Sequence, residues 1–352
     1  MTPRERFLAA CNRESVDATP VWFMRQAGRY LREYKEIKGN RPVLEICKIP
    51  EICEKITILP LTELDVDAAV MFADIMLPLE GMGVQLHIEE DVGPIIHNKI
   101  ERLSDAEVLK EFLAKEHIPY VLETIKRVKE RLKESKKALI GFSGAPFTLA
   151  SYMIEGRPSR DFVSTKKMMY GDKETWKLLM TKLSTMVSDY LASQIESGVD
   201  SVQLFDSWVG TLSARDYLEY VAPYTNVIFK RLRSEYGSTP TIHFGTGTSH
   251  LLRTMKDKVG GDVFSVDWRI PLRQALQILG RDNAIQGNLE PSVLTVDPRM
   301  RDFIASRVSE ILEEGRDAEG HIFNLGHGVL RETPVENAKY VVNYVHENSK
   351  RG

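Results

Sequence analysis

The stretch Ala138-Leu139-Ile140-Gly141-Phe142 is one of eight short apolar runs that decide the expected fold of this chain. The runs are rich in β-branched and aromatic residues and lack polar alternation, which indicates strands buried on both faces of a parallel sheet. The predicted strands are Val21–Met24, Ala68–Phe72, Ala138–Phe142, Ser201–Phe205, Thr241–Phe244, Val263–Val266, Ala284–Gln286 and His321–Asn324.

Helical patterns separate the predicted strands. Thr2-Pro3-Arg4-Glu5 combines a capping box with proline at the first helical position, which predicts a helix at the start of the chain. Ser104-Asp105-Ala106-Glu107 is a second capping box. In residues 121–132 and 176–191 the apolar side chains fall on one helical face, so the Met-rich stripe of the second segment is interpreted as core packing.

Eight alternations of strand and helix predict an α/β fold, a (β/α)8 TIM barrel formed by residues 1–352 as a single domain. A doubly wound parallel sheet is the competing fold, and strand counting does not exclude it. Alternating residues in 84–96 predict a small hairpin after the second strand.

Composition narrows the class of protein. The 352 residues are 43% hydrophobic and carry a net charge of −3, which argues against a binder of nucleic acid or anionic membranes. Cys11, Cys47 and Cys53 lack Cys-x-x-Cys spacing, so we expect reduced thiols and no disulfide frame or zinc site. No signal peptide or bilayer-spanning stretch is apparent, which predicts a cytoplasmic protein.

In a TIM barrel the active site lies where the strands end, so the residues after each apolar run are the candidate functional residues. Met24-Arg25-Gln26-Ala27-Gly28-Arg29-Tyr30 follows the first run and holds two arginines, whose guanidinium groups suit carboxylates. The corresponding candidates after the second, third, fourth and eighth runs are Asp74, Tyr152, Ser207 and His327.

Each of these residues also has a structural interpretation. Asp74 could cap the following helix, and Ser207 could form a turn. Tyr152 and Phe142 are as well suited to packing as to ligand binding. Three further charged residues at strand ends are interpreted as structural and ion-paired, and one glycine-rich segment as a turn. These are Asp206, Asp267 and Arg269, and Gly245-Thr246-Gly247-Thr248.

Taken together, these segments closely resemble the uroporphyrinogen decarboxylase family, over nearly the whole chain and in order. The motifs Met24–Tyr30 and Asn324-Leu325-Gly326-His327-Gly328 are the most specific. The other matching segments are Asp65–Leu79, Gly141–Gly156, Leu204–Gly210 and Gln286–Pro291.

The resemblance implies a (β/α)8 barrel, usually a homodimer, that removes CO2 from the four acetate side chains of uroporphyrinogen III. The product is coproporphyrinogen III, on the route to haem, and no metal or organic cofactor is implied. Carried over by residue, the resemblance implies substrate binding by Arg25, Gln26, Ala27, Gly28, Arg29, Asp74, Tyr152, Ser207 and His327.

Asp74 and Arg25 are the expected catalytic residues. A carboxylate at Asp74 would accept hydrogen bonds from pyrrole N–H groups and stabilise the positive charge that develops on the protonated ring. Arg25 is the positional candidate for the proton donor, but a guanidinium is a poor acid. A water molecule or a substrate carboxyl group positioned by Arg25 is the alternative donor.

Two departures from the family pattern add positive charge. Arg32 and Arg331 stand where proline is common in the family, and we expect them to strengthen the attraction of a polyanionic substrate. Two rival functions were weighed. A zinc-thiolate methyltransferase on the same barrel lacks ligands here, because no cysteine follows Cys53. A tetrapyrrole carrier would gain nothing from a carboxylate such as Asp74.

Overall fold

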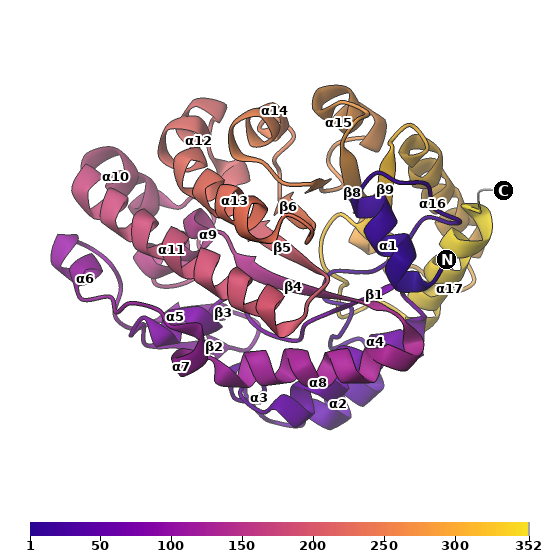
Figure 1. The fold of residues 1–352 in the computed structure, drawn as a ribbon, viewed down its shortest axis with the longest axis horizontal. Helices are drawn as coiled ribbons and strands as arrows, with labels where there is room; N and C mark the ends of the chain where they lie inside the picture. The colour runs from indigo at the N-terminus through magenta and orange to yellow at the C-terminus, as the bar shows by residue number, and fades with distance from the viewer. Residues whose placement is uncertain (351–352) are drawn as a thin grey trace.

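The structure is a computed structural model that describes residues 1–350; residues 351 and 352 of the expected domain lie outside the described residues. It is an α/β fold in which a curled parallel sheet is surrounded by helices (Figure 1). The strands of this sheet are β1 (Ala68–Val70), β4 (Ala138–Gly144), β5 (Ser201–Asp206), β6 (Thr241–Gly245), β7 (Val263–Ser265), β8 (Ala284–Leu289) and β9 (Gly320–Leu325).

The α-helices lie mostly between consecutive strands, outside the sheet (Figure 1). They are α1 (Pro3–Cys11), α2 (Arg32–Lys38), α3 (Val43–Ile46), α4 (Pro50–Leu64), α5 (Leu77–Gly81), α6 (Leu103–Glu107), α7 (Ala114–His117), α8 (Pro119–Ser135), α9 (Pro146–Glu155), α10 (Val163–Gly171), α11 (Lys173–Ser197), α12 (Ala214–Tyr220), α13 (Ala222–Tyr236), α14 (Leu252–Thr254), α15 (Leu272–Leu279), α16 (Arg301–Gly315) and α17 (Val335–Asn348). Shorter turns are η1 (Val209–Thr211), η2 (Met255–Val259) and η3 (Pro291–Thr295). None of the helices in residues 1–350 is both long and apolar enough to cross a bilayer.

Strand order decides between the two folds considered from sequence. The order β1-β4-β5-β6-β7-β8-β9 follows the chain without the reversal that defines a doubly wound sheet. All six strand pairings are parallel. Seven of the eight predicted runs therefore lie in one sheet, although the second strand ends at Val70 and not at Phe72. The N–H of Phe72 donates instead to the Thr57 hydroxyl, at 3.0 Å.

The first predicted strand, Val21–Met24, is not a regular strand in this structure. Only Val21 pairs with a strand, through a parallel bridge to Phe323 in β9. The backbone still contacts both edges of the sheet: the N–H of Phe323 donates to the carbonyl of Pro20 at 2.8 Å, and that of Asp67 to the carbonyl of Val21 at 2.8 Å. The segment 20–23 thus lies between β9 and the start of β1.

Side chains explain why this segment forms no regular ladder. The N–H of Val21 donates to the carboxylate of Asp67 at 2.8 Å, and the N–H of Phe23 to the side-chain carbonyl of Gln26 at 3.0 Å. The N–H of Met24 donates to the side chain of Asn324 at 3.2 Å. Polar side chains therefore satisfy donors that a neighbouring strand would otherwise satisfy.

A buried polar layer inside the curled sheet connects the same segment to distant strands. The indole N–H of Trp22 donates to the side-chain carbonyl of Gln286 at 2.9 Å. The amide nitrogen of Gln286 lies 3.0 Å from the side-chain oxygen of Gln203 and 2.9 Å from the hydroxyl of Ser265. All four residues are buried, so this network sets the position of Trp22 relative to β5, β7 and β8.

Most local predictions agree with the structure. Helix α1 has the predicted capping box at Thr2, and β2 (Leu86–Glu89) pairs with β3 (Gly93–Ile96) as the predicted antiparallel hairpin. The second capping box is wrong: α6 begins at Leu103, before Ser104, because the carboxylate of Asp105 accepts the N–H groups of Glu101 and Arg102. The Met-rich stripe of α11 is buried, as expected for core packing.

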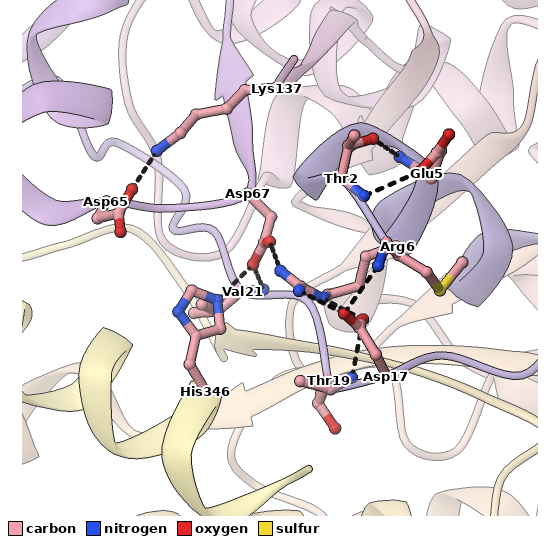
Figure 2. A network of polar contacts seen from close by, with 12 residues as sticks. Thr2, Glu5, Arg6, Asp17, Thr19, Val21, Asp65, Asp67, Lys137 and His346 are labelled. Carbon is pink, nitrogen blue, oxygen red and sulfur yellow. Dashed lines mark hydrogen bonds and ion pairs between the residues drawn. The ribbon is translucent and has the colours of Figure 1, made fainter. Parts of the chain in front are cut away.

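The carboxylate of Asp67, directly before β1, holds the segment 20–23 in place (Figure 2). It is 1% exposed and accepts from the N–H of Val21 at 2.8 Å and from Nη1 of Arg6 in α1 at 2.7 Å. Nε2 of His346 in α17 lies 2.8 Å from the same carboxylate. Arg6 also binds Asp17 through two nitrogens, at 2.7 and 2.8 Å. Both ends of the described chain therefore meet beneath the sheet at one buried charge.

Replacing Asp67 by asparagine should lower the free energy of unfolding by about 3 kcal/mol, because the substitution leaves buried donors without their charged acceptor. Urea denaturation at pH 7 measures the change. The control E36Q removes an exposed ion pair with Arg32 and should cost less than about 0.5 kcal/mol. Equal effects of the two substitutions would contradict the assigned role of Asp67.

Candidate active site

The loop Met24–Tyr30 carries both predicted arginines and continues directly from the segment 20–23. Arg25 has a positive φ of 59°, and its side chain is exposed. Gln26 is buried, and its side chain bonds the backbone of Phe23 and, at 3.0 Å, the carbonyl of Ala68 in β1. The Gln26 side chain thus fixes the loop to the sheet, and its expected contact with substrate stays a prediction.

Glycines allow this loop to approach its neighbours closely. A Cβ on Gly28 would lie 3.0 Å from the carbonyl oxygen of Arg25, and Ala27 beside it is half-buried. A Cβ on Gly328 would overlap Cδ of Arg25, so the arginine stem packs directly on this glycine. The N–H of Val329 donates to the carbonyl of Met24 at 2.8 Å. The loops after the segment 20–23 and after β9 are therefore joined.

Asp74 lies four residues after the end of β1 and is half-buried. One carboxylate oxygen accepts the N–H of Met76 at 2.9 Å, which is a local turn bond, whereas the expected helix cap is not seen because Met76 is the N-cap of α5 and has no side-chain cap bond. Burial raises the pKa of Asp74, while the Met76 N–H and the charge of Arg25 oppose the shift. The second oxygen accepts no hydrogen bond from residues 1–350, so the carboxylate keeps an accepting atom for a ligand.

His327 lies in the loop after β9, and its ring centroid is 6.2 Å from that of Phe244 in β6. Burial lowers the pKa of His327 to about 4, and the positive charges of Arg25 and Arg269 lower it further, against the opposing charge of Asp267. His327 is therefore neutral at pH 7. It can donate or accept a hydrogen bond there but adds no positive charge.

Tyr152 projects from α9, which begins just after β4. Burial raises its pKa to about 12, so the phenol stays protonated and can donate a hydrogen bond. Its ring lies edge-on to that of Trp208, with centroids 6.0 Å apart. Ser207 directly precedes Trp208 after the end of β5 and is half-buried.

Three phenylalanines stack on the inner side of the sheet, where Phe142 and Phe205 are half-buried and Phe244 is buried. Phe142, Phe205 and Phe244 come from the neighbouring strands β4, β5 and β6 and stack edge to face in sequence. Centroids are 5.5 Å apart for the first pair and 5.7 Å for the second. The ring of Phe244 also contacts that of His327. A flat, apolar ligand face can pack here while polar groups at the strand ends bind its periphery.

The positive charge of Arg25 affects the pKa of Asp74, Tyr152 and His327, so these three predicted residues lie within electrostatic range of one guanidinium group. Arg29 lies farther out. It is 43% exposed and donates to Asp91 at 3.0 Å, with Glu90 at 3.5 Å. Arg29 is thus a residue at the rim of the group.

Two of the residues interpreted as structural and ion-paired, Asp267 and Arg269, behave as expected. Asp267 is buried and forms an ion pair with Arg269, and its Oδ2 also accepts the N–H of Gly247 at 2.6 Å, within the predicted glycine-rich turn. The ion pair expected for Asp206 is not confirmed: Asp206 is fully buried, its Oδ2 lies 3.6 Å from Nε2 of His243, and neither of its oxygens accepts a hydrogen bond from residues 1–350.

Sequence analysis missed several residues that shape this site. Phe205 and Phe244 end predicted strands, and period-two alternation through these strands could have identified them as inward-facing. Asp91 and Trp208 gave no usable signal, because their importance depends on segments that are far away in the chain.

Known proteins of one family are similar to this chain over nearly its whole length. A sequence model of the uroporphyrinogen decarboxylase (URO-D) family matches residues 2–348. Curated proteins named uroporphyrinogen decarboxylase are similar over nearly their whole length. That of Carboxydothermus hydrogenoformans is 46% identical over 345 residues, covering 98% of this chain and 97% of its own. That of Sorangium cellulosum is 47% identical over 342 residues, covering 97% and 96%.

Solved structures share the fold at low identity. A methyltransferase from Methanosarcina mazei has a TM-score of 0.81 at 22% identity, covering 99% of both chains. A putative vitamin-B12-independent methionine synthase from Listeria monocytogenes has a TM-score of 0.58 at 14% identity, covering 96% of this chain and 98% of its own. Similarity at this identity concerns the fold alone.

We predict that His327 stays neutral well below the pH at which an exposed histidine titrates. NMR of the imidazole nitrogens should give a midpoint near 4, because burial and Arg25 disfavour the charged ring. Between the unfolded value of about 6.5 and this midpoint, the unfolded state binds more protons. Stability should therefore fall as the pH falls through this range, and H327Q should reduce that slope. A midpoint near 6.5 would contradict the assignment.

Substituting Gly328 by alanine should displace the Arg25 stem, because the new Cβ would overlap it. Because the charge of Arg25 lowers the pKa of His327, this pKa should be higher in G328A, where the guanidinium has moved away. The R25Q substitution should raise it as well, and NMR titration measures both changes. G171A is the matched control, because a Cβ on Gly171 meets no atom within 4 Å. An unchanged His327 titration in G328A and R25Q would mean that Arg25 does not act on this ring.

Proposed function

The chain belongs to the uroporphyrinogen decarboxylase family, and from that premise we propose that it removes CO2 from the four acetate side chains of uroporphyrinogen III. The product is coproporphyrinogen III, in porphyrin biosynthesis. The observation that carries this proposal is the half-buried carboxylate of Asp74 after β1, within the influence of the charge of Arg25, whose stem packs on Gly328 next to His327.

The substrate carries eight carboxylates, whereas the protein has a net charge of −3, so attraction must be local. Arg25 and Arg29 are the cations of the proposed site, and their guanidinium groups bind carboxylates through charge-assisted hydrogen bonds. His327 contributes a neutral hydrogen bond, because its lowered pKa keeps it uncharged at pH 7. Tyr152 donates from its phenol.

Asp74 is the proposed electrostatic catalyst. Its free oxygen would accept pyrrole N–H groups while the tetrapyrrole face packs near Phe205. Protonation of a pyrrole carbon next to nitrogen makes the ring cationic, and the carboxylate stabilises this charge as it develops. Because burial disfavours the isolated charge of Asp74, pairing with a cationic ring relieves that cost and favours the intermediate over the substrate.

The electrons of the decarboxylation then move into the substrate itself. The bond between the acetate methylene and its carboxylate breaks, and CO2 leaves. The electron pair of this bond neutralises the cationic ring, which then carries an exocyclic methylene group. A proton added to this methylene and the loss of the ring-carbon proton give a methyl group. Each arm thus consumes one proton in total, and the substrate's own ring accepts the electrons, which is why we propose no metal or organic cofactor.

The proton donor is proposed to be a water molecule or substrate carboxyl group that Arg25 positions. A guanidinium rarely releases its proton in proteins, so Arg25 is better suited to orientation than to acid catalysis.

The sheet has seven regular strands, and the segment 20–23 lies between its two edges. We propose that the segment 20–23 acts as the eighth strand of a closed (β/α)8 barrel and that the chain forms a single domain. The backbone bonds of Pro20 to Phe323 and of Val21 to Asp67 support this closure. A homodimer is part of the same proposal, and sedimentation of the purified protein tests it.

A tetrapyrrole carrier is the alternative from a different class of function. Anaerobic incubation with reduced uroporphyrinogen III, followed by chromatography of the oxidised products, distinguishes the two. Successive loss of carboxylates down to the tetracarboxylate supports the decarboxylase. Unchanged substrate with folded protein would refute it, and a binding titration would then test the carrier.

D74N should lower kcat by about 10²–10³, because asparagine keeps the turn bond but loses the charge that stabilises the cationic ring. Binding of coproporphyrin, followed by fluorescence, should change far less. D297N is the matched control, because the exposed Asp297 makes the same local bond to the N–H two residues later, at 2.9 Å to Arg299. A D74N enzyme with full activity would leave Asp74 only its structural role.

A further inference from the structure

The hairpin of β2 and β3 connects two sides of the proposed active site. Its stem lies beside the end of α9, the helix of Tyr152, where the N–H of Ile96 donates to the carbonyl of Gly156 at 2.7 Å. Its turn carries Asp91, which has a φ of 61°. From there the Asp91 side chain contacts residues of two other loops, those that follow the segment 20–23 and β9.

One oxygen of Asp91 accepts from two arginines. Nη1 of Arg29 lies 3.0 Å from Oδ1 of Asp91, and Nη1 of Arg331 lies 2.7 Å from the same oxygen. Both guanidinium groups therefore point at one carboxylate position. Other acidic neighbours each contact only one of them, Glu90 near Arg29 and Glu332 near Arg331.

The position of this pair is set by the core of the site. Arg29 is in the loop of Arg25, and Arg331 is three residues after Gly328, on which the Arg25 stem packs. Because the two loops are joined at Arg25, their backbones keep the two rim arginines on neighbouring loops even if the hairpin turn moves. The rim thus offers two guanidinium groups to one carboxylate, a position that Asp91 fills here.

The Asp91 contacts suit exchange with a ligand. The side chains of Arg29, Arg331 and Asp91 are 43%, 53% and 55% exposed, and exposed ion pairs shift an equilibrium by roughly fivefold or less. A carboxylate on a ligand that is also held elsewhere can therefore replace Asp91. The stem bonds of the hairpin need not break, because only the turn carries the contact.

We propose that Arg29 and Arg331 together bind one peripheral carboxylate of the substrate, and that Asp91 occupies this position in the free protein and leaves when substrate enters. Arg331 is thus an additional substrate-binding residue, and Asp91 competes with the substrate. This inference rests on the proposed function, since it takes the ligand to be a tetrapyrrole polycarboxylate. The binding site predicted from sequence is extended by one arginine.

The test is steady-state kinetics with uroporphyrinogen III under anaerobic conditions. D91N removes the competing charge while asparagine tolerates the left-handed turn, so KM should fall about two- to fivefold with kcat unchanged. R331Q should raise KM by roughly fivefold, again with little change in kcat. In D91N/R331Q the gain from D91N should shrink, because one of the two released donors is absent.

Two controls separate this effect from general charge. E89Q removes a negative charge from the same hairpin, and among residues 1–350 Glu89 forms no ion pair with either arginine. R299Q removes an arginine that is 90% exposed and pairs with Asp297. Both should leave KM nearly unchanged.

An unchanged KM in D91N, an equal change in E89Q, or an R331Q enzyme with unaltered KM would overturn the inference while the decarboxylase assignment stands. Absence of turnover by the wild-type protein would instead overturn the proposed function, and this inference with it.

Discussion

The buried carboxylate of Asp67 joins the beginning and the end of the described chain to the first strand of the sheet. Arg6 comes from α1, His346 from α17, and the N–H of Val21 from the segment between the sheet edges. A charge that is 1% exposed is stable only when several donors surround it, so these elements must assemble together. The loop with both site arginines begins a few residues after Val21. The bond between Val21 and Asp67 therefore helps to set the position of these arginines.

In the segment 20–23 and the loop that follows it, hydrogen bonds from polar side chains replace a regular strand ladder. The Gln26 side chain bonds the backbone of Phe23 within the segment and that of Ala68 in β1, and the Asn324 side chain accepts the N–H of Met24. The result is a backbone that is fixed without continuous strand pairing and can turn sharply at Arg25. The buried bond between Trp22 and Gln286 keeps the segment from sliding along its neighbours. Precision in the site thus comes from side-chain hydrogen bonds in the core.

The charges of the site are arranged in two zones. In the inner zone, burial raises the pKa of Asp74 and lowers that of His327 to about 4, so the positive charge near these two groups comes from Arg25 and not from the histidine. In the outer zone, Arg29 and Arg331 are exposed and share a surface carboxylate. Charges in low dielectric act strongly at short range, whereas exposed charges are screened and exchangeable. This separation suits a ligand with a central ring and carboxylates at its edge.

The sequence by itself determined most strands, the first helix, the hairpin and the identity of the candidate residues, because apolar runs, capping boxes and residue types act locally. It identified Asp74 and Arg25 through short motifs. It could not predict that Val21–Met24 would lack a regular ladder, because the competing acceptors belong to Asp67 and Asn324, far along the chain. Nor could it predict a neutral His327 or the position of Asp91 between two arginines. Burial and through-space charge depend on which loops meet, and only the folded chain decides that.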